Sequence, residues 1–347
     1  MTPLAGIIAA RIRATGPISL ADYMQICLLD SRYGYYATHD PFGQKGDFVT
    51  SPEIHQVFGE ICGLALAQAW MDQGRPAPFT LAEPGPGRGT LMADMLRTLR
   101  AVPGMREAAE VALIEASPHL RQVQTERLGQ VLHLDHVEDL PVKPLFMIAN
   151  EFIDALPIRQ FQMTEGGWRE RMVGLCDKGT LRLGLGEVVP LPREGSVGDI
   201  VEECPEGVAF VEALGRRIAA QGGAAIIIDY GGWNGFGDTF QALCNHLPED
   251  PLAHPGEADL TAHVDFAPLA AAALRGGAEV SRPLRQGDWL LALGAEARAR
   301  KLEAAGDAGA MSALHRLTHP SEMGHLFKAM AIWPKGAPAV PGFVALE

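Results

Sequence analysis

Long apolar runs, disulfide patterns and metal-binding spacings are all missing from this sequence of 347 residues. No apolar run reaches the roughly 18 residues of a membrane-spanning helix, and the start has neither the basic region nor the cleavage site of a signal peptide. The cysteines are odd in number and scattered without a C-x-x-C pair: Cys27, Cys62, Cys176, Cys204 and Cys244. We therefore expect a cytoplasmic protein with reduced thiols, no disulfide framework, no metal and no membrane insertion.

Basic residues are outnumbered: the chain has 29 Lys and Arg against 42 Asp and Glu, a net charge of -13. Because this charge repels polyphosphate, nucleic acid is not expected as a partner. The charge favours cationic ligands and basic peptide segments, although acidity also serves solubility alone. No internal repeat is visible, and the length suits one large decorated domain or two modest ones.

Short apolar runs alternate with helical patterns along much of the chain. After the first run, Leu91, Met95 and Leu99 share one helical face while Asp94 and Arg97 point the other way. Such alternation predicts a parallel sheet with helices on both faces. The runs, each suited to a strand buried on both sides, are 78–83, 110–116, 144–150 and 224–231.

Three stretches depart from this alternation. Residues 1–70 read as an N-terminal helical segment that could act as a lid, and residues 71–347 as the main domain. Within that domain, 158–205 reads as inserted antiparallel strands joined by GG and KG turns, and 231–265 is too long for an ordinary loop. Residues 324–333 predict a last strand, at the edge of the sheet and possibly antiparallel.

The strongest local signal is FTLAEPGPGRGTL, in which a buried strand ends at Glu83 and runs into Gly85, Gly87 and Gly89 before a helix. Ligands of open α/β sheets bind at this end of the strands, where glycines allow close approach and the helix start offers free N–H groups. Thr90 replaces the third glycine of a dinucleotide fingerprint. The pattern E-x-G-x-G-x-G is instead typical of class I S-adenosylmethionine (SAM) methyltransferases; the alternative is a simple tight turn.

A second acid, Glu115, closes the next strand in LIEASP. An acidic side chain at this position can accept hydrogen bonds from both ribose hydroxyls of a nucleotide. It also precedes Ser117 and Pro118, a plausible helix N-cap and first helical residue, so it could equally belong to a helix start. Both roles can hold at once.

The third strand runs into NEFIDALP at 150–157, which places Asn150, Glu151 and Asp154 at the same edge of the sheet. Methyl transfer from a sulfonium needs a positioned nucleophile, and these groups could hold a nitrogen there. If that nitrogen belongs to arginine, whose guanidinium stays protonated, carboxylates are needed to grip it and to accept a proton. The alternative is that Asn150 and Asp154 only satisfy backbone groups of the loop.

Other polar clusters carry weaker signals. The His- and Asp-containing segment 254–266 invites a metal interpretation, but its spacings match no metal-ligand motif and it could simply begin a helix. Asp229 and Tyr230 end the last of the four strands and could line the pocket. Thr50 and Glu53 have the spacing of a capping box for the helix that follows.

Taken together, these motifs resemble the MidA-like SAM-dependent methyltransferases, a family that includes a mitochondrial complex I assembly factor. The resemblance covers nearly the whole chain, and the combination is far more specific than any single motif. It is carried by GPISLADYM (16–24), YGYY (33–36), GDFVTSPE (46–53), FGE (58–60), EPGPGRGTL (83–91), NEFIDALP (150–157), IDYG (228–231), PGEADLTAHVDF (255–266) and MGHLFKAM (323–330).

The resemblance implies a Rossmann-like class I fold with a mainly parallel seven-stranded sheet and helices on both faces. It also implies SAM as methyl donor and symmetric dimethylation of a protein arginine. In the family the target is a core subunit of respiratory complex I, so a bacterial member could modify the equivalent subunit. Gly85, Gly87 and Gly89 would face the cofactor and Glu115 its ribose.

Two positions depart from the family's pattern. Pro84 stands where many members have leucine, which should stiffen the loop, and Asp135 stands where an aromatic residue is expected, which leaves the adenine contact unassigned.

Two other functions stay open. One is a dinucleotide-dependent oxidoreductase, disfavoured by Thr90, and the other is an assembly chaperone that dispenses with catalysis.

Overall fold

The computed structural model describes residues 2–38, 50–244 and 247–346, which form two compact units. Unit 1 comprises Met1–Phe48, Asp154–Gly207 and Gly232–Asp265, and unit 2 comprises Val49–Ile153, Val208–Gly231 and Phe266–Glu347. The expected division at residue 70 and the lid role of residues 1–70 stay predictions.

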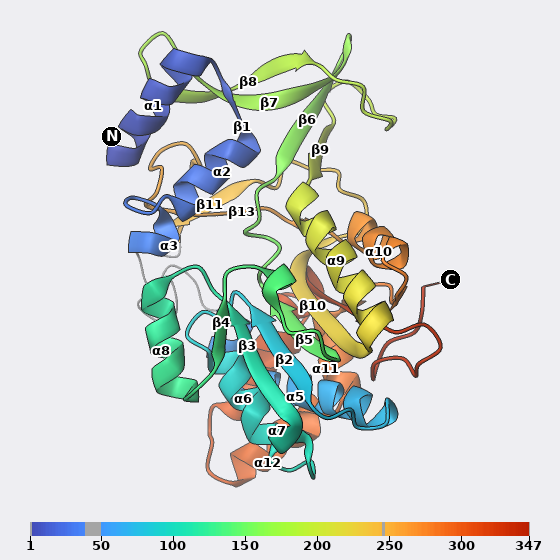
Figure 1. Cartoon of the computed structure of the whole chain (residues 1–347). Helices are drawn as coiled ribbons and strands as arrows, with labels where there is room; N and C mark the ends of the chain where they lie inside the picture. Colours follow the sequence, from blue (N-terminus) through green and yellow to red (C-terminus); the bar gives the residue numbers. More distant parts are fainter. Residues whose placement is uncertain (1, 39–49, 245–246, 347) are drawn as a thin grey trace. The chain divides into compact units, whose positions relative to one another are not determined.

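Unit 2 contains a mainly parallel sheet with strand order β15-β17-β10-β5-β2-β3-β4, in which β17 runs antiparallel to its neighbours (Figure 1). The seven strands in this order confirm the predicted class I methyltransferase sheet, to which further short strands are added. The short strand β16 also pairs with β17. The strands are β2 (Phe79–Pro84), β3 (Ala109–Ile114), β4 (Leu132–Leu134), β5 (Leu145–Asn150), β10 (Gly223–Gly232), β15 (Glu279–Val280), β16 (Leu284–Arg285) and β17 (Phe327–Trp333).

The central strands are apolar because both of their faces are covered. Every residue of β2 and of β5 is buried, which is the pattern of a parallel strand between two helical layers. Pairing Pro84 with Ile114, Ile114 with Leu134 and Asn150 with Ile228 brings the carboxyl ends of the parallel strands to one edge. The predicted site residues of unit 2 follow these ends.

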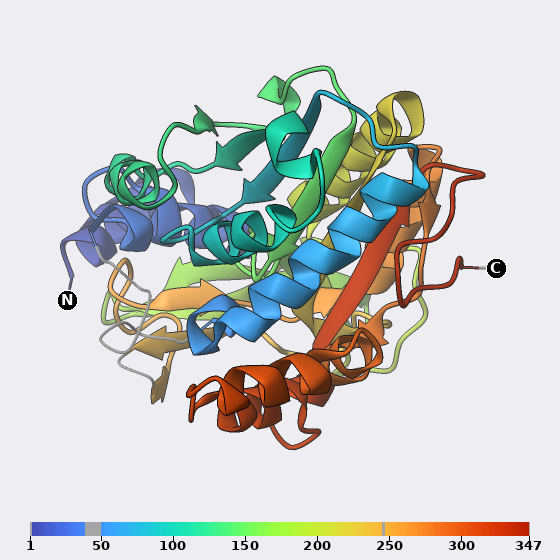
Figure 2. The ribbon, with the colours of Figure 1, turned by 90° about the horizontal axis from the view of Figure 1, so that it is seen from below.

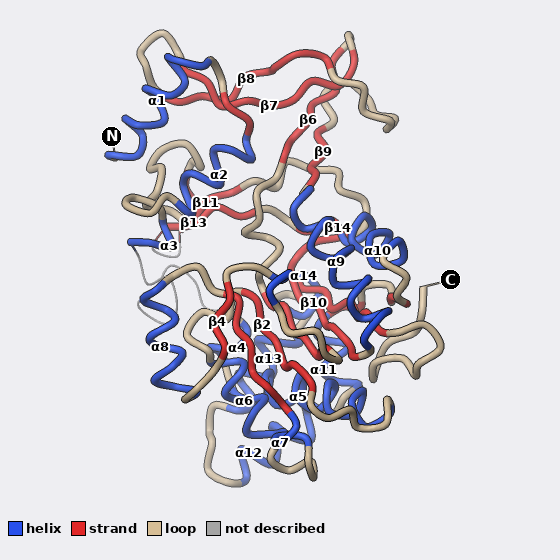
Figure 3. The backbone as a smooth tube through the Cα atoms, in the orientation of Figure 1, coloured by secondary structure: helices blue, strands red, loops and turns tan. Residues whose placement is uncertain are grey.

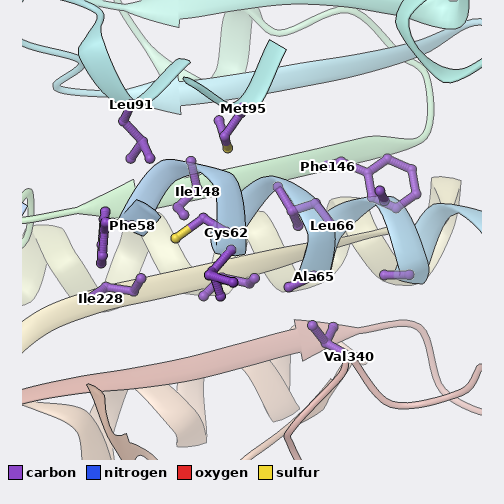
Figure 4. Close-up of a cluster of buried hydrophobic side chains, with 14 of the residues drawn as sticks. Phe58, Cys62, Ala65, Leu66, Leu91, Met95, Phe146, Ile148, Ile228 and Val340 are labelled. Carbon is purple, nitrogen blue, oxygen red and sulfur yellow. The ribbon is translucent and has the colours of Figure 1, made fainter. Parts of the chain in front are cut away.

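One face of the sheet carries a large apolar core. The helix α5 lies along this face close to β17, as Figure 2 shows, and its Phe58, Cys62 and Leu66 pack with Leu91 of α6 and Ile148 of β5 (Figure 4). The helices of unit 2 are α4 (Ser51–Ile54), α5 (Gln56–Asp72), α6 (Thr90–Leu99), α7 (Met105–Ala108), α8 (Pro118–Leu128), α9 (Pro205–Gln221), α10 (Phe266–Arg275), α11 (Gln286–Ala292), α12 (Ala295–Ala304), α13 (Ala310–Thr318) and α14 (Met323–Leu326), with a 3₁₀ turn at Val137–Asp139. Among the described residues, no helix combines the length and the apolarity needed to cross a bilayer.

The last strand differs from its prediction in one respect. β17 is antiparallel, as expected, but it is not an edge strand, because β10 pairs with one side and β15 and β16 pair with the other. Each of these two covering strands has only two residues. Strands this short leave no periodic pattern in a sequence, so the edge assignment was wrong.

Unit 1 combines helices with antiparallel strands, drawn in blue and red in Figure 3. The inserted strands predicted within 158–205 are present as β6, β7, β8 and β9. Together with β1 from the N-terminal segment they form a sheet of order β1-β7-β6-β9, with β8 paired to β7. A second antiparallel sheet has order β12-β11-β13. The elements are α1 (Pro3–Thr15), β1 (Ile18–Ser19), α2 (Leu20–Leu29), α3 (Tyr35–Thr38), β6 (Arg159–Thr164), β7 (Gly167–Leu175), β8 (Leu181–Val188), β9 (Ile200–Glu203), β11 (Gln241–Cys244), β12 (Leu247–Glu249), β13 (Asp259–Thr261) and β14 (Val264–Asp265).

Candidate active site

The glycine loop joins β2 to α6 with a backbone that other residues adopt only under strain. Gly85, Gly87 and Gly89 have φ of 60°, 51° and 73°, and Gly89 is the N-cap of α6. A Cβ on Gly85 would lie 3.0 Å from Cδ2 of Phe152, in the loop after β5. The loop therefore needs glycine at position 85 for both its conformation and its packing.

Thr90 has a structural role at the start of α6. Its hydroxyl donates to Oε1 of Glu53 at 2.5 Å.

The predicted capping box is wrong, since Thr50 precedes α4 without any side-chain capping bond. The helix also breaks after α4 and restarts at α5, where Nδ1 of His55 accepts from the backbone N–H of Val57 at 3.2 Å. Residues 46–49 of the GDFVTSPE motif lie outside the described residues.

Glu83, at the end of β2, is a buried acid with only 3% of its surface exposed. Burial raises the pKa of its carboxyl group well above the usual value, and a hydrogen bond from the backbone of Met92 opposes this only in part. Its Oε2 atom is buried and has no hydrogen-bond partner. An unsatisfied buried acceptor costs stability, and folded proteins seldom leave one without a partner.

Glu115 has the helix-start role that its sequence position allows, and its ribose-binding role stays a prediction. Oε1 accepts from the backbone N–H of Ser117 at 2.8 Å, and Ser117 caps α8 by accepting from Leu120 at 3.4 Å, with Pro118 as the first helical residue. Oε2 accepts from Nε2 of Gln124 at 3.1 Å. Burial raises the pKa of Glu115, and these hydrogen bonds partly offset that shift. Each oxygen retains a lone pair that can accept from a further hydroxyl.

Gln124 of α8 contacts two of the predicted site residues, and the sequence analysis missed it. It is fully buried, and its Nε2 donates to the carbonyl of Gly87 at 2.7 Å as well as to Glu115. Its Oε1 lies 3.0 Å from Nε2 of His133 in β4. One signal could have found it: Gln124 lies one helical turn after the buried Leu120, on the same face, where a polar residue is uncommon.

Arg121 fixes the ends of β3 and β4. Its Nε donates to the carbonyl of Glu115 at 2.7 Å, and its Nη2 donates to the carbonyl of Leu134 at 3.1 Å and to Oδ1 of Asp135 at 2.6 Å. The departure at Asp135 thus has a structural use, because its carboxylate holds the guanidinium that ties the two strands. The adenine contact stays unassigned.

Asn150 and Glu151 lie in direct contact where β5 ends. Glu151 has a φ of 49°, a left-handed conformation that is uncommon for a residue other than glycine. Its Oε1 accepts from the backbone N–H of Ser51 at 2.9 Å and from Nδ2 of Asn150 at 2.9 Å. Oδ1 of Asn150 is buried without a hydrogen-bond partner. Backbone strain of this kind persists where the surroundings fix it, and it clusters at functional sites.

Asp229 stabilises the loop that follows Glu151. It is fully buried at the end of β10, and its Oδ2 accepts from the backbone N–H of Ile153 at 3.0 Å while Oδ1 accepts from Tyr230 at 3.0 Å. The ring of Tyr230 packs edge-on against Phe327, with centroids 5.4 Å apart. These contacts are structural, and the expected pocket-lining role of both residues stays a prediction.

Asp154 belongs to unit 1 and is buried there. Its carbonyl accepts from the backbone N–H of Ala262 at 3.0 Å, just after β13. Tyr36 donates to Oδ1 of Asp259 at 3.2 Å. The pKa of Tyr36 is raised well above the usual value, first by loss of water and then by the charges of Asp259 and Asp154. Asp154 and Asp259 therefore lie close enough to the same phenol to affect its ionisation.

The segment 254–266 forms no metal centre in the described part of the chain. Nδ1 of His254 lies 2.9 Å from Oε2 of Glu249, and the backbone N–H of His263 donates to Thr239. Among the described residues, no group of three His, Cys, Asp or Glu is placed to hold a metal ion.

Comparison with known proteins gives consistent results. A family model of S-adenosyl-L-methionine-dependent methyltransferases matches residues 61–284. A mitochondrial protein of Drosophila melanogaster, named protein arginine methyltransferase NDUFAF7 homolog, is 36% identical over 95% of this chain and 85% of its own. The human mitochondrial protein arginine methyltransferase NDUFAF7 is 34% identical over 96% of this chain and 84% of its own. A crystal structure from Burkholderia thailandensis with bound S-adenosyl-homocysteine has a TM-score of 0.85 at 28% identity, covering 98% of this chain and 95% of that one.

The sheet order, the glycine loop and the acid after β3 define a class I SAM-dependent methyltransferase. The chain belongs to the MidA-like family of these enzymes, and SAM is its cofactor. The residues present fit this group: Glu83 and Asn150 each hold a buried acceptor without a hydrogen-bond partner at the strand edge that carries the glycine loop. The oxidoreductase alternative is therefore set aside.

Proposed function

We propose that this methyltransferase transfers the methyl group of SAM to an arginine of a protein substrate, and that its product is symmetric dimethylarginine. The names of the Drosophila and human relatives support arginine as acceptor. The observation that carries the proposal is Glu151, a carboxylate fixed by two hydrogen bonds on a strained backbone at the carboxyl edge of the sheet. A core subunit of respiratory complex I is the candidate target, which would give the enzyme a part in complex assembly.

In this proposal the glycine loop, Glu83 and Glu115 bind the cofactor. Gly85, Gly87 and Gly89 let the ligand approach the backbone, and Glu115 accepts from the ribose hydroxyls. Glu83 supplies a buried acceptor, and the positive charge of bound SAM favours its ionised form although burial alone raises its pKa. The cofactor itself supplies a methyl group activated by a sulfonium.

Asn150, Glu151 and Asp154 bind the acceptor nitrogen. A guanidinium stays protonated in water, so it must lose a proton as the nitrogen attacks the methyl group. Carboxylates hold the cation in place and can take that proton, while Asn150 fixes the orientation of Glu151 through its amide. The two carboxylates of this set are Glu151 and Asp154.

Calorimetric titration with SAM and S-adenosylhomocysteine tests the cofactor site. We expect micromolar binding, worth about -8 kcal/mol, to be lost in Gly87→Val, because valine at a φ of 51° is strained. Exposed Gly104→Val at the start of α7 is the control for introducing valine at a left-handed glycine, since nothing lies within 4 Å of the added carbon. Equal binding by wild type and Gly87→Val would contradict this placement of the cofactor.

The acceptor residues are tested by separating binding from turnover. Glu151→Gln and Asp154→Asn should retain SAM affinity and lose methyl transfer, whereas the exposed Glu165→Gln should leave both unchanged. A parallel loss of SAM affinity in the two acceptor variants would refute the assignment. If Gly87→Val abolished SAM binding but still supported complex assembly in the parent organism, the chain would act there as a chaperone.

A cytoplasmic location remains part of the proposal. The five cysteines are scattered along the sequence without a C-x-x-C pair, a usage that supports a reducing compartment. Cell fractionation followed by immunodetection tests it, and recovery in a membrane or secreted fraction would contradict it.

A further inference from the structure

We infer that Gln124 is a positioning residue that sets the ribose specificity of the cofactor site through Glu115. This inference rests on the cofactor placement proposed above. One amide joins the two parts of that site: Nε2 reaches the carbonyl of Gly87 at 2.7 Å and Oε2 of Glu115 at 3.1 Å. No other described residue is recorded in hydrogen bonds to both.

The chemistry of its partners fixes the orientation of this amide. A backbone carbonyl and a carboxylate are both acceptors, so the end of Gln124 that faces them must be the NH₂ group. Oε1 then faces Nε2 of His133 at 3.0 Å and must accept, so His133 carries a proton on that nitrogen. Burial, and then the nearby Arg121, lower the pKa of His133, so the neutral ring with its proton on Nε2 suffices for this bond.

The consequence concerns the rotation of the Glu115 carboxylate. Ser117 holds Oε1 and Gln124 holds Oε2, so the two bonds together fix the plane of the group. A fixed plane presents its remaining lone pairs in one direction, as two adjacent ribose hydroxyls require. Without Gln124, only the backbone N–H groups of Ser117 and Ala116 would hold the carboxylate. The carboxylate could then rotate, and the gain from matching a ribose hydroxyl would be lost.

The test is a titration with S-adenosylhomocysteine and with its 2′-deoxy analogue. Wild type should bind the analogue about 10-fold or more weakly, the value of one hydrogen bond to a charged group. Gln124→Met keeps the length and volume of the side chain but removes its hydrogen bonds. We expect this variant to bind S-adenosylhomocysteine about 10-fold more weakly and to lose most of its discrimination against the 2′-deoxy analogue.

Controls separate this inference from the proposed cofactor site. Gln122→Met, an exposed position on the same helix, should match wild type. If Gln124→Met weakened both ligands by the same factor, its role would be structural and the inference would be overturned. If Glu115→Ala left S-adenosylhomocysteine affinity unchanged, the cofactor placement itself would be wrong. If Glu115→Ala lost affinity while Gln124→Met bound both ligands like wild type, only the positioning role would fail.

Discussion

Replacement of Glu83 by glutamine should make the protein more stable while weakening its cofactor binding. Glu83 is buried at the end of β2, its pKa is raised by burial, and its Oε2 atom has no hydrogen-bond partner. Ionisation of Glu83 in the folded chain is therefore costly, whereas the unfolded chain ionises freely. Glutamine has the same shape and does not ionise.

The sign and size of this stability difference follow from proton linkage. The folded chain retains a proton on Glu83 that the unfolded chain releases above its ordinary pKa of about 4.3. The free energy of unfolding of wild type therefore falls by about 1.4 kcal/mol per pH unit from this group, until the raised folded pKa is passed. Glutamine does not ionise, so Glu83→Gln lacks this loss.

Urea denaturation of wild type and Glu83→Gln between pH 5 and pH 8 measures the difference between their free energies of unfolding. We expect the free energy of unfolding of the variant to exceed that of wild type by an amount that grows with pH. We also expect the variant to bind SAM more weakly than wild type does. The exposed Glu165→Gln controls for the removal of a carboxylate and should follow wild type. Parallel stability curves for wild type and Glu83→Gln would refute the reasoning, because the carboxyl group would then titrate alike in both states.

Two further predictions concern packing and a buried ion pair. Gly85→Ala places a Cβ 3.0 Å from Cδ2 of Phe152 on a backbone with a φ of 60°. It should therefore lower the free energy of unfolding by about 1–2 kcal/mol. Urea denaturation measures this, and an unchanged midpoint would contradict the claim that alanine is strained there. Arg298 makes two hydrogen bonds of 2.6 and 2.9 Å to Glu60, whose side chain is 6% exposed, so Arg298→Met should cost about 3 kcal/mol by leaving that carboxylate poorly paired. Arg300→Met on the same helix removes only an exposed pair and should cost under about 0.5 kcal/mol; equal effects in the two variants would show that the burial of Glu60 does not matter.

Much of unit 2 could be predicted because its signals are local. Strands buried on both faces appear as continuous apolar runs, and the observed bounds of the four predicted strands differ from the expected ones by at most two residues. The glycine loop and the Ser117 cap are also local, since each depends on the conformation of neighbouring residues. The apolar runs, the loop glycines and the helix cap all indicate the same fold, which made this fold predictable.

The remaining features depend on contacts between distant segments. Asp94 was expected on the outer face of its helix, yet it is buried, because Gly59 of α5 allows α6 to approach closely. The role of Gln124 depends on Gly87, Glu115 and His133, which come from three other segments. A local sequence pattern cannot predict contacts between segments that are far apart in the sequence.

The central claim is that this methyltransferase acts on arginine, and transfer of labelled methyl groups tests it most directly. The purified protein would be incubated with methyl-labelled SAM and a protein extract from a strain that lacks its gene, and the labelled protein would be hydrolysed to amino acids. We predict that the label appears as symmetric dimethylarginine with wild type and is absent with Glu151→Gln. Label on another amino acid, or equal labelling by both proteins, would contradict the account.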